Sequence, residues 1–242
     1  MVSVKTNLTP SAAISGEYDF QCQQVSQEST LLISLAQDNS QPGFDHGMQT
    51  SMLNNLIEHG WSQHNFFLST DLVLALATEC MALQSNDGLV LAGVGRGKAH
   101  EIREQIRGDQ IHWLNTGQSL ACDQYLDLME NVRLFLNQHL FLGLDEYESH
   151  FAFYAPGTSY IKHIDRFRDY DRRMISAVVY LNEDWLPEQG GALRLHLEEN
   201  RTEDISPLAC RLVLFLSAEI AHEVLPATRN RLSIAGWFKR RG

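Results

Sequence analysis

The stretch HEVLPATRNRLSIAGWF, residues 222–238, contains two runs of β-type residues on either side of a short polar segment. If residues 227–230 form a four-residue hairpin loop, His222 lies opposite Ala235 on the next strand. Because side chains alternate between the two faces of a strand, four residues of the second run share the face of His222: Arg231, Ser233, Ala235 and Trp237. The stretch therefore predicts an antiparallel strand pair with a histidine and an arginine on one face.

Short β-type runs of this kind continue back along the chain to residue 147, separated by turns: YESHFAFYA, SYIKHID, MISAVVYLN, GALRLHL and CRLVLFLS. The preceding part has helical spacing of apolar residues instead, in SMLNNLIEHGW (51–61), in STDLVLALATECMALQ (69–84) and from Ala121 to His139. Ser69 or Thr70 is the expected N-cap of the second helix. Helices followed by many short strands predict an α+β fold, with helices packed on an antiparallel sandwich or barrel.

The chain divides into an extension and one domain. Residues 1–45 are rich in Ser, Gln and Thr without sustained periodicity, which predicts a polar N-terminal extension. The remaining residues, 46–242, are long enough for one core, and 44% hydrophobic content is ordinary for a globular protein. We expect a helical part over residues 46–145 and a β-sheet core over residues 146–242.

Composition excludes several functional classes. A net charge of −11 argues against a nucleic-acid-binding protein, which needs a broad basic surface, and we expect the basic tail, residues 239–241, to be a solvated end. No apolar run is long enough to span a membrane, and the first residues lack the apolar core of a secretory signal. The four cysteines show no C-x-x-C spacing, which argues against zinc and disulfide frameworks and favours the cytoplasm.

Two pairs of residues have the spacing of metal ligands on a strand. His163 and Asp165 lie two positions apart in YIKHIDRFRDYDRR, residues 160–173, and His196 and Glu198 have the same spacing. With 10 histidines and 30 acidic residues in 242, about 1.2 such pairs are expected by chance. Spacing alone therefore does not choose between them.

A third candidate ligand favours the first pair. His222 adds a second histidine far downstream, and Arg231 follows it nine positions later. Two histidines and one carboxylate on one face of a metal leave three octahedral positions open, which is the arrangement of non-heme Fe(II) oxygenases. An arginine that points into a half-apolar strand pair is costly unless an anion meets it, so Arg231 predicts a carboxylate partner, with Ser233 as a further hydroxyl donor.

At this point the sequence resembles the 2-oxoglutarate- and Fe(II)-dependent oxygenases of the prolyl 4-hydroxylase superfamily, in particular bacterial relatives of the hypoxia-type prolyl hydroxylases. The matching segments follow one another in order from residue 106 onward: IRGDQIHW (106–113), YAPGTSYIKHID (154–165), YLNEDW (180–185), GGALRL (190–195) and HEVLP…RLSIAGW (222–237). The resemblance implies a double-stranded β-helix, or jelly-roll, core of antiparallel sheets flanked by N-terminal helices.

The resemblance also implies roles for individual residues. The iron ligands become His163, Asp165 and His222. Arg231 becomes the salt-bridge partner of the distal carboxylate of 2-oxoglutarate, assisted by Tyr180 and Tyr154. A family threonine that contacts the co-substrate is replaced here by Ala235, and Ser233 takes over part of its role. Residues at the substrate entrance are Arg107, Asp109, Arg173 and Trp237, of which the three charged residues have a structural ion-pair network as the alternative.

The implied activity needs Fe(II), 2-oxoglutarate and O2, with ascorbate as reductant, and releases succinate and CO2. Its substrate is a protein or peptide, hydroxylated at proline. Two alternatives stay open: hydroxylation of a free amino acid or other small molecule, and a non-catalytic sensor that binds iron and 2-oxoglutarate. The second His-x-acid pair, at residues 196 and 198, is assigned to a solvated strand face, GVGRG (93–97) to a loop near the entrance, and RFRDYDRR (166–173) to a charged loop or a substrate-selecting segment.

Overall fold

The computed structural model describes residues 43–93, 106–165 and 172–241. Nearly all of the predicted extension lies outside the described residues, as do most of GVGRG and of RFRDYDRR. Within the described part of the chain, no helix is long and apolar enough to cross a membrane. Three cysteines of this part, at positions 80, 122 and 210, are free and buried.

The described residues contain three α-helices, and each is capped by a side chain at its N-terminus. They are α2 (His46–His59), α3 (Thr70–Ser85) and α4 (Leu120–Leu140). Ser69 accepts a hydrogen bond from the backbone N–H of Leu72, which confirms it as the N-cap of α3. Asp45 caps α2 and Ser119 caps α4 in the same way. The helix boundaries thus follow the hydroxyl and carboxylate side chains that satisfy the first backbone N–H groups.

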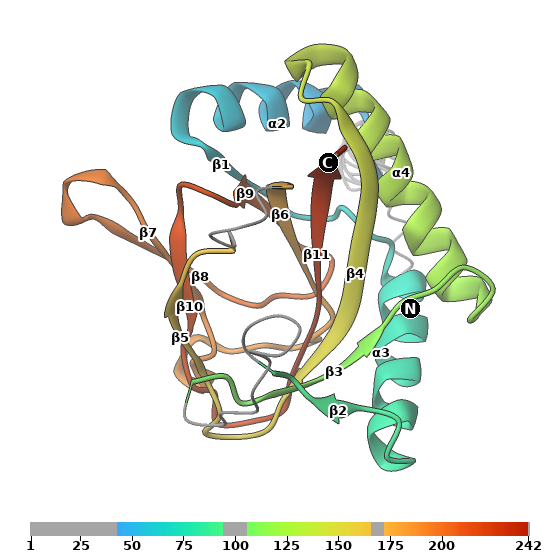
Figure 1. Cartoon of the computed structure of the whole chain (residues 1–242). Coiled ribbons are helices and arrows are strands. Elements are labelled where there is room, and N and C mark those ends of the chain that lie inside the picture. The colour runs from blue at the N-terminus through green and yellow to red at the C-terminus, as the bar shows by residue number, and fades with distance from the viewer. Residues whose placement is uncertain (1–42, 94–105, 166–171, 242) are drawn as a thin grey trace, which may run out of the picture. The chain divides into compact units, whose positions relative to one another are not determined.

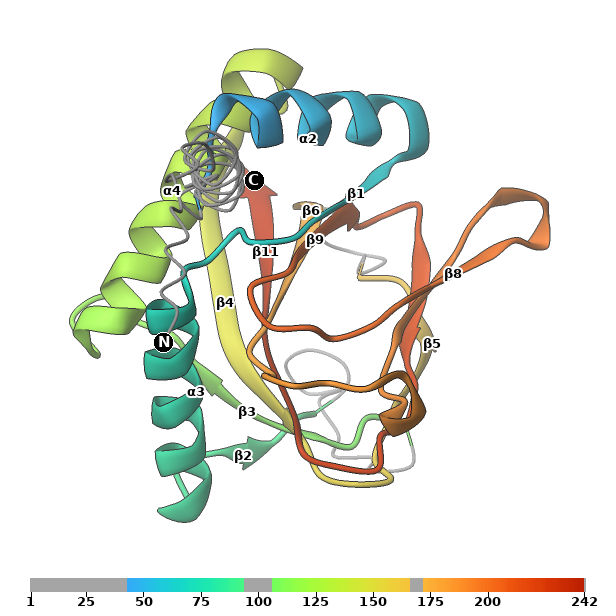
Figure 2. The same ribbon diagram turned by 180° about the vertical axis from the view of Figure 1, so that it is seen from behind.

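The strands of the described residues form two antiparallel sheets. The major sheet has seven strands in the order β1 (Trp61–His64), β9 (Leu212–Leu216), β6 (Arg173–Tyr180), β11 (Arg231–Arg240), β4 (Leu144–Tyr154), β3 (Asp109–Trp113) and β2 (Val90–Leu91). The minor sheet has four: β5 (Tyr160–His163), β10 (Ala221–Val224), β7 (Leu193–His196) and β8 (Thr202–Ile205). Figure 1 and, from behind, Figure 2 show the helices on one side of the major sheet and the minor sheet on the other. This arrangement confirms the α+β class and the jelly-roll core.

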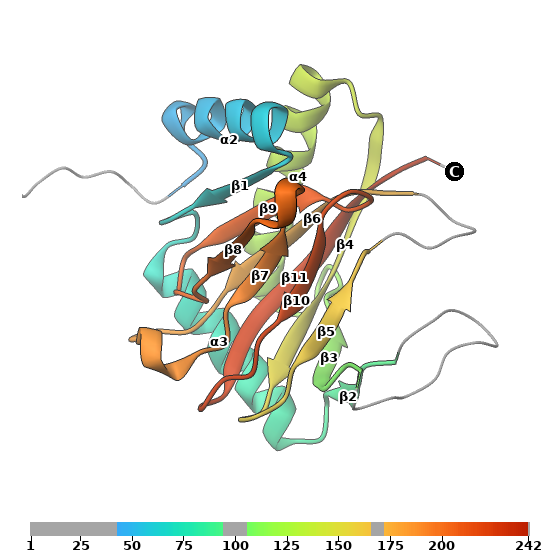
Figure 3. The ribbon, with the colours of Figure 1, turned by 90° about the vertical axis from the view of Figure 1, so that its left-hand side faces the viewer.

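Each face of the major sheet meets a different environment. Its outer face packs on the helices through apolar residues, among them Phe151, Ile234 and Phe238. Its inner face turns toward the minor sheet, and Figure 3 shows that sheet in front of it, with the helices behind. Along β11 the inner face carries four residues, which confirms the predicted two-residue period: Arg231, Ser233, Ala235 and Trp237.

The predicted hairpin between residues 222 and 238 is wrong. β10 pairs with β5 and β7 in the minor sheet, whereas β11 pairs with β4 and β6 in the major sheet. His222 therefore lies opposite His163 and Leu195, and not opposite Ala235. The chain changes sheets between β10 and β11. In a sandwich of this kind, the two strands pack their inner faces against each other across the core instead of pairing edge to edge.

Two further expectations from the sequence need correction. Residues 46–145 also contain three strands, β1, β2 and β3, and β8 was not predicted; these strands are two to five residues long and mostly lack an apolar alternation. Within the basic tail, Lys239 is buried and forms ion pairs of 2.8 Å with Glu146 and 2.7 Å with Glu148. At Lys239 the tail is thus the end of a central strand, and neighbouring carboxylates compensate the charge of this lysine. Arg240 and Arg241 are exposed, as predicted.

Gly236 tests the packing between β11 and β4. A Cβ atom there collides with the Tyr147 hydroxyl and lies 2.8 Å from the carbonyl oxygen of Glu148, so we expect Gly236→Ala to lower the free energy of unfolding by about 1–3 kcal/mol. Chemical denaturation measures this change. The control is Gly47→Ala, whose Cβ meets nothing closer than 3.4 Å and which should leave stability unchanged or slightly raised. Equal stability of Gly236→Ala and the unaltered chain would contradict the packing described here.

Candidate active site

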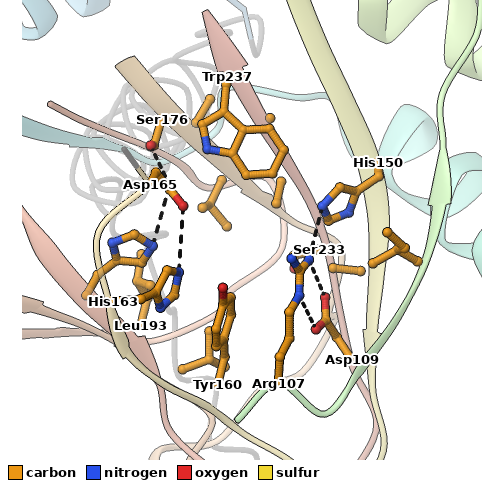
Figure 4. Close-up of a pocket in the computed structure, with 18 of the residues that line it drawn as sticks. Arg107, Asp109, His150, Tyr160, His163, Asp165, Ser176, Leu193, Ser233 and Trp237 are labelled. Atoms are coloured by element: carbon orange, nitrogen blue, oxygen red, sulfur yellow. Dashed lines mark hydrogen bonds and ion pairs between the residues drawn. The ribbon is translucent and has the colours of Figure 1, made fainter. Parts of the chain in front are cut away.

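Three potential metal ligands converge between the two sheets. The ladder between β5 and β10 places His163 opposite His222, and Asp165 follows β5 by two residues. The Asp165 carboxylate approaches both rings: its Oδ1 is 3.6 Å from His163 Nε2, as Figure 4 shows, and its Oδ2 is 3.6 Å from His222 Nε2. One ligand atom from each residue lies within 4.8 Å of the others, and among the described residues this is the one cluster of such side chains. The predicted triad is therefore assembled from two strands that are far apart in sequence.

Backbone carbonyls orient both imidazole rings. His163 Nδ1 lies 2.8 Å from the carbonyl oxygen of Ile161, and His222 Nδ1 lies 3.2 Å from that of Ile220. A carbonyl oxygen only accepts, so each Nδ1 carries a proton and each Nε2 is the ring atom available to a metal beside Asp165. Tyr160 stacks on the His163 ring with 3.6 Å between ring centroids. This donor set of two imidazoles and one carboxylate fits a divalent transition metal.

The surroundings of His163 and Asp165 keep both side chains in the protonation states that a metal requires. Removal from water, aided by His222 nearby, lowers the pKa of His163 to about 4. For Asp165, burial would raise the pKa, but the two histidines and the Ser176 hydroxyl outweigh it and lower the pKa to about 2. At neutral pH His163 is therefore neutral and Asp165 is ionised.

A second polar cluster surrounds Arg231, which is 1% exposed. Its Nε donates to the carbonyl oxygen of Gly191 at 2.8 Å, and its Nη1 donates to Ser233 Oγ at 3.2 Å. The guanidinium lies between the rings of Tyr154 and Tyr180, 5.1 and 5.2 Å from their centroids. No carboxylate of the described residues forms an ion pair with Arg231, and the buried Tyr180 hydroxyl has no partner among them either. The Arg231 charge and the Tyr180 hydroxyl together suit an anion with several acceptor lone pairs, such as a carboxylate.

The opposite wall carries charges that are already paired. Arg107 donates from Nε and Nη2 to the two carboxylate oxygens of Asp109 at 2.8 and 3.0 Å, and His150 Nε2 lies 3.4 Å from Arg107 Nη2. The Arg173 guanidinium lies 3.5 Å from the centroid of the Trp237 ring and 3.0 Å from Glu148. The ion-pair network, one of the two alternatives for Arg107, Asp109 and Arg173, is therefore present. These residues also line the cavity of the site.

One cavity of 360 Å³ unites these groups, and most of the residues predicted from the sequence line it: His163, Asp165, His222, Arg231, Ser233, Ala235, Tyr154, Arg107, Asp109, Arg173 and Trp237. Tyr180 lies outside that lining and faces Arg231 from the same sheet. The rival pair is elsewhere: His196 bonds to Glu223 at 3.0 Å, and Glu198 lies in a 3-10 turn.

Sequence reasoning missed four polar residues of the cavity: Glu148, His150, Tyr160 and Ser176. For His150 and Ser176 a signal exists in the two-residue period. Ser176 precedes Tyr180 by four positions on β6, and His150 precedes Tyr154 by four positions on β4, so each shares the inward face of its tyrosine. Burial, with Arg107 nearby, lowers the pKa of His150 to about 4, so its ring is neutral at neutral pH.

Comparison with known proteins places this geometry in a family. Residues 149–239 match the model of the 2OG-Fe(II) oxygenase superfamily. The structure is similar to that of a Pseudomonas putida prolyl-4-hydroxylase, with 53% sequence identity, a TM-score of 0.75, and coverage of 80% of this chain and 100% of that one. A prolyl hydroxylase from Trichoplax adhaerens, solved with a hypoxia-inducible factor peptide fragment, is 27% identical with a TM-score of 0.71, over 80% of this chain and 89% of that one.

Among curated proteins, the hypoxia-inducible factor prolyl hydroxylase of Caenorhabditis elegans is 32% identical over 205 residues, which is 77% of this chain and 27% of that protein. The chain spans between 27% and 55% of the length of the curated relatives that it matches. The similarity to the Pseudomonas enzyme covers the whole of that chain. The family model covers Arg231 and all three residues of the triad, so both comparisons indicate the same family. The chain therefore belongs to the 2OG-Fe(II) oxygenase superfamily, as a member of the prolyl hydroxylase type.

Proposed function

We propose that the chain is an Fe(II)- and 2-oxoglutarate-dependent dioxygenase that hydroxylates proline in a protein or peptide. One observation carries the proposal: a triad of ligand atoms within 4.8 Å shares its cavity with a buried arginine that lacks an anionic partner among the described residues. A metal and a carboxylate co-substrate supply what the two clusters lack. The family membership agrees with this pairing.

Each cluster has a separate task. His163, Asp165 and His222 hold the iron, with both Nε2 atoms and the carboxylate directed at one point. Arg231 and the Tyr180 hydroxyl bind the distal carboxylate of 2-oxoglutarate, and the Ser233 hydroxyl adds a donor where the family threonine is replaced by Ala235. When bound, the iron, 2-oxoglutarate and O2 supply an oxidation that releases succinate and CO2 and places one oxygen atom on a substrate C–H bond. The remaining task of the protein is to keep the cavity dry and the groups fixed.

The charges of the cavity favour an uncharged substrate segment. Among the described lining residues, Arg107 is neutralised by Asp109, and Glu148 bonds to Arg173, while Arg231 is assigned to the co-substrate. A free amino acid brings an ammonium and a carboxylate, each of which is costly to bury without a partner. A proline within a peptide brings neutral amides and an apolar ring, which suits a cavity lined by Trp113, Tyr160 and Trp237. The Trichoplax relative solved with a peptide supports this choice.

The structure supports the two alternative functions less well. Hydroxylation of a free amino acid requires a charge partner for it, and a non-catalytic sensor does not require the complete set of ligands and carboxylate-binding donors. Ascorbate as the reductant of idle enzyme and a cytoplasmic location stay predictions from the resemblance and the composition.

Arg231 tests the co-substrate site. Replacing Arg231 with Ala removes the charge that the carboxylate needs, so we expect 2-oxoglutarate to bind the Mn²⁺-loaded protein about 100-fold more weakly or worse, while Mn²⁺ affinity stays the same. For Tyr180→Phe we expect a loss of about ten- to 100-fold, because one hydrogen bond to a charged group is removed. Calorimetry measures both affinities. Arg229→Ala, at an exposed arginine two residues before β11, is the control. Equal loss of metal and co-substrate in Arg231→Ala would mean that Arg231 is structural.

Acid should release the metal. His163 binds a metal only when its imidazole is neutral, and since burial lowers the pKa of His163 to about 4, protons compete at this ligand only as the pH falls below about 5. At pH 4 this competition should lower Mn²⁺ affinity about twofold, and we expect a loss of about tenfold by pH 3. Titrations of the metal-free protein between pH 6 and pH 3 measure the effect, and an affinity that stays constant down to pH 3 would exclude His163 as a ligand.

Turnover is the direct test of the proposed activity. The purified protein, loaded with Fe(II) without oxygen, should form succinate after addition of 2-oxoglutarate and O2, and faster when cell extract supplies a substrate. Mass spectrometry should then find a gain of one oxygen on a proline of a peptide. We expect His222→Ala to abolish succinate formation and His196→Ala, on the neighbouring strand, to preserve it. Oxygen gain on metabolites alone would favour the small-molecule hydroxylase, and iron binding without succinate would favour the sensor.

A further inference from the structure

Two buried serines stand behind the carboxylate of the triad. Ser176 Oγ, on β6, lies 2.7 Å from Asp165 Oδ2, and Ser217 Oγ, directly after β9, lies 2.8 Å from Ser176 Oγ. Figure 4 shows Ser176 beside Asp165, on the side away from His163. The exposed fractions are 1% for Ser176 and 0% for Ser217, so bulk water does not compete for these hydrogen bonds. Together the three side chains form a continuous chain of hydrogen bonds that ends at Oδ2 of the candidate ligand Asp165.

The direction of each hydrogen bond follows from the proton count. Ser176 Oγ donates to Asp165 Oδ2, since a carboxylate that binds a metal only accepts. The single hydroxyl proton of Ser176 therefore goes to Asp165 Oδ2. Since Ser176 then has no proton left for its neighbour, Ser217 must be the donor between the two serines.

The backbone holds this hydroxyl chain in place. Ser176 lies in the middle of the major sheet, paired with Phe215 on one side and Trp237 on the other. The backbone N–H of Ser217 donates to the carbonyl oxygen of Met174 at 3.1 Å, which fixes Ser217 beside β6. The hydroxyl groups thus derive their positions from the sheet itself and need no metal to assemble.

We propose that Ser217 and Ser176 are positioning residues for the metal site: the hydroxyl chain holds Asp165 through Oδ2 and leaves Oδ1 to bind the metal. Hydrogen bonds in a chain strengthen one another, so Ser217 acts on the metal only through Ser176, although it touches no ligand. This inference rests on the proposed function, because it requires a divalent metal at the triad. It adds a residue that neither the sequence pattern nor the cavity lining marks.

The test measures Mn²⁺ affinity of the metal-free full chain by calorimetry. We expect Ser176→Ala to weaken Mn²⁺ binding about 10- to 100-fold, as loss of an outer hydrogen bond to a metal ligand does. For Ser217→Ala we expect a smaller weakening, about threefold or more. The double variant should bind Mn²⁺ as weakly as Ser176→Ala alone, because Ser217 has nothing to act through once Ser176 is gone.

A matched control separates this effect from the loss of any buried hydroxyl. Ser62, on β1, is 1% exposed and its hydroxyl has no partner among the described residues, so Ser62→Ala should leave Mn²⁺ affinity unchanged. Thermal unfolding of each metal-free variant checks that the fold is retained. If Ser217→Ala does not fold, Ser217→Cys keeps the size of the side chain with a weaker donor and should weaken Mn²⁺ binding in the same direction.

Two results would overturn the inference: unchanged Mn²⁺ affinity in the Ser217 variants, or an equal loss from Ser217→Ala with and without Ser176. Both are read against an unaltered chain that binds Mn²⁺, so the proposed function survives them. Failure of the unaltered chain to bind Mn²⁺ would instead remove the metal site and the inference together.

Discussion

The structure depends on a central sheet whose two faces must satisfy opposite demands. On one face of β11, Leu232, Ile234 and Phe238 pack into the core beneath the helices, while Arg231 and its inward neighbours face the cavity. A buried arginine costs several kcal/mol unless an anion meets it. The fold tolerates this cost because the helices bury a large apolar core on the other face of the same strand. The buried polar residues of the cavity are therefore stabilised indirectly by the apolar packing between the helices and the other face of the sheet.

The residues of the site are divided between the two sheets. The minor sheet presents two histidines as a cross-strand pair, and the major sheet presents Arg231 and the serines that support Asp165. Cross-strand neighbours lie about 4.5–5.5 Å apart, which suits two ligands of one metal. The co-substrate donors stand on a separate sheet, so a ligand that reaches from metal to Arg231 bridges the sandwich. Metal binding and carboxylate binding can thus be altered separately.

Charge pairing divides the cavity into a reactive side and a neutral wall. Arg107 with Asp109, and Arg173 with Glu148, are mutually compensated, whereas the triad and Arg231 keep their binding capacity for groups from outside. His150, neutral because it is buried, faces Arg107 and adds no charge of its own. The wall therefore offers hydrogen bonds and aromatic surface without net charge, which is what a peptide segment requires.

The sequence by itself determined the strand faces, the start of α3 and the candidate ligands, because alternation, an N-cap and the order of motifs can be read along the chain. Arg231 and Ser233 could be placed on one inward face from the two-residue period alone. Which strands pair could not be predicted: His222 faces His163 across the minor sheet, and not Ala235, because the chain changes sheets to bury both apolar faces. Only the tertiary structure brings Ser217 to Asp165, since 52 positions separate them and no local pattern encodes that distance.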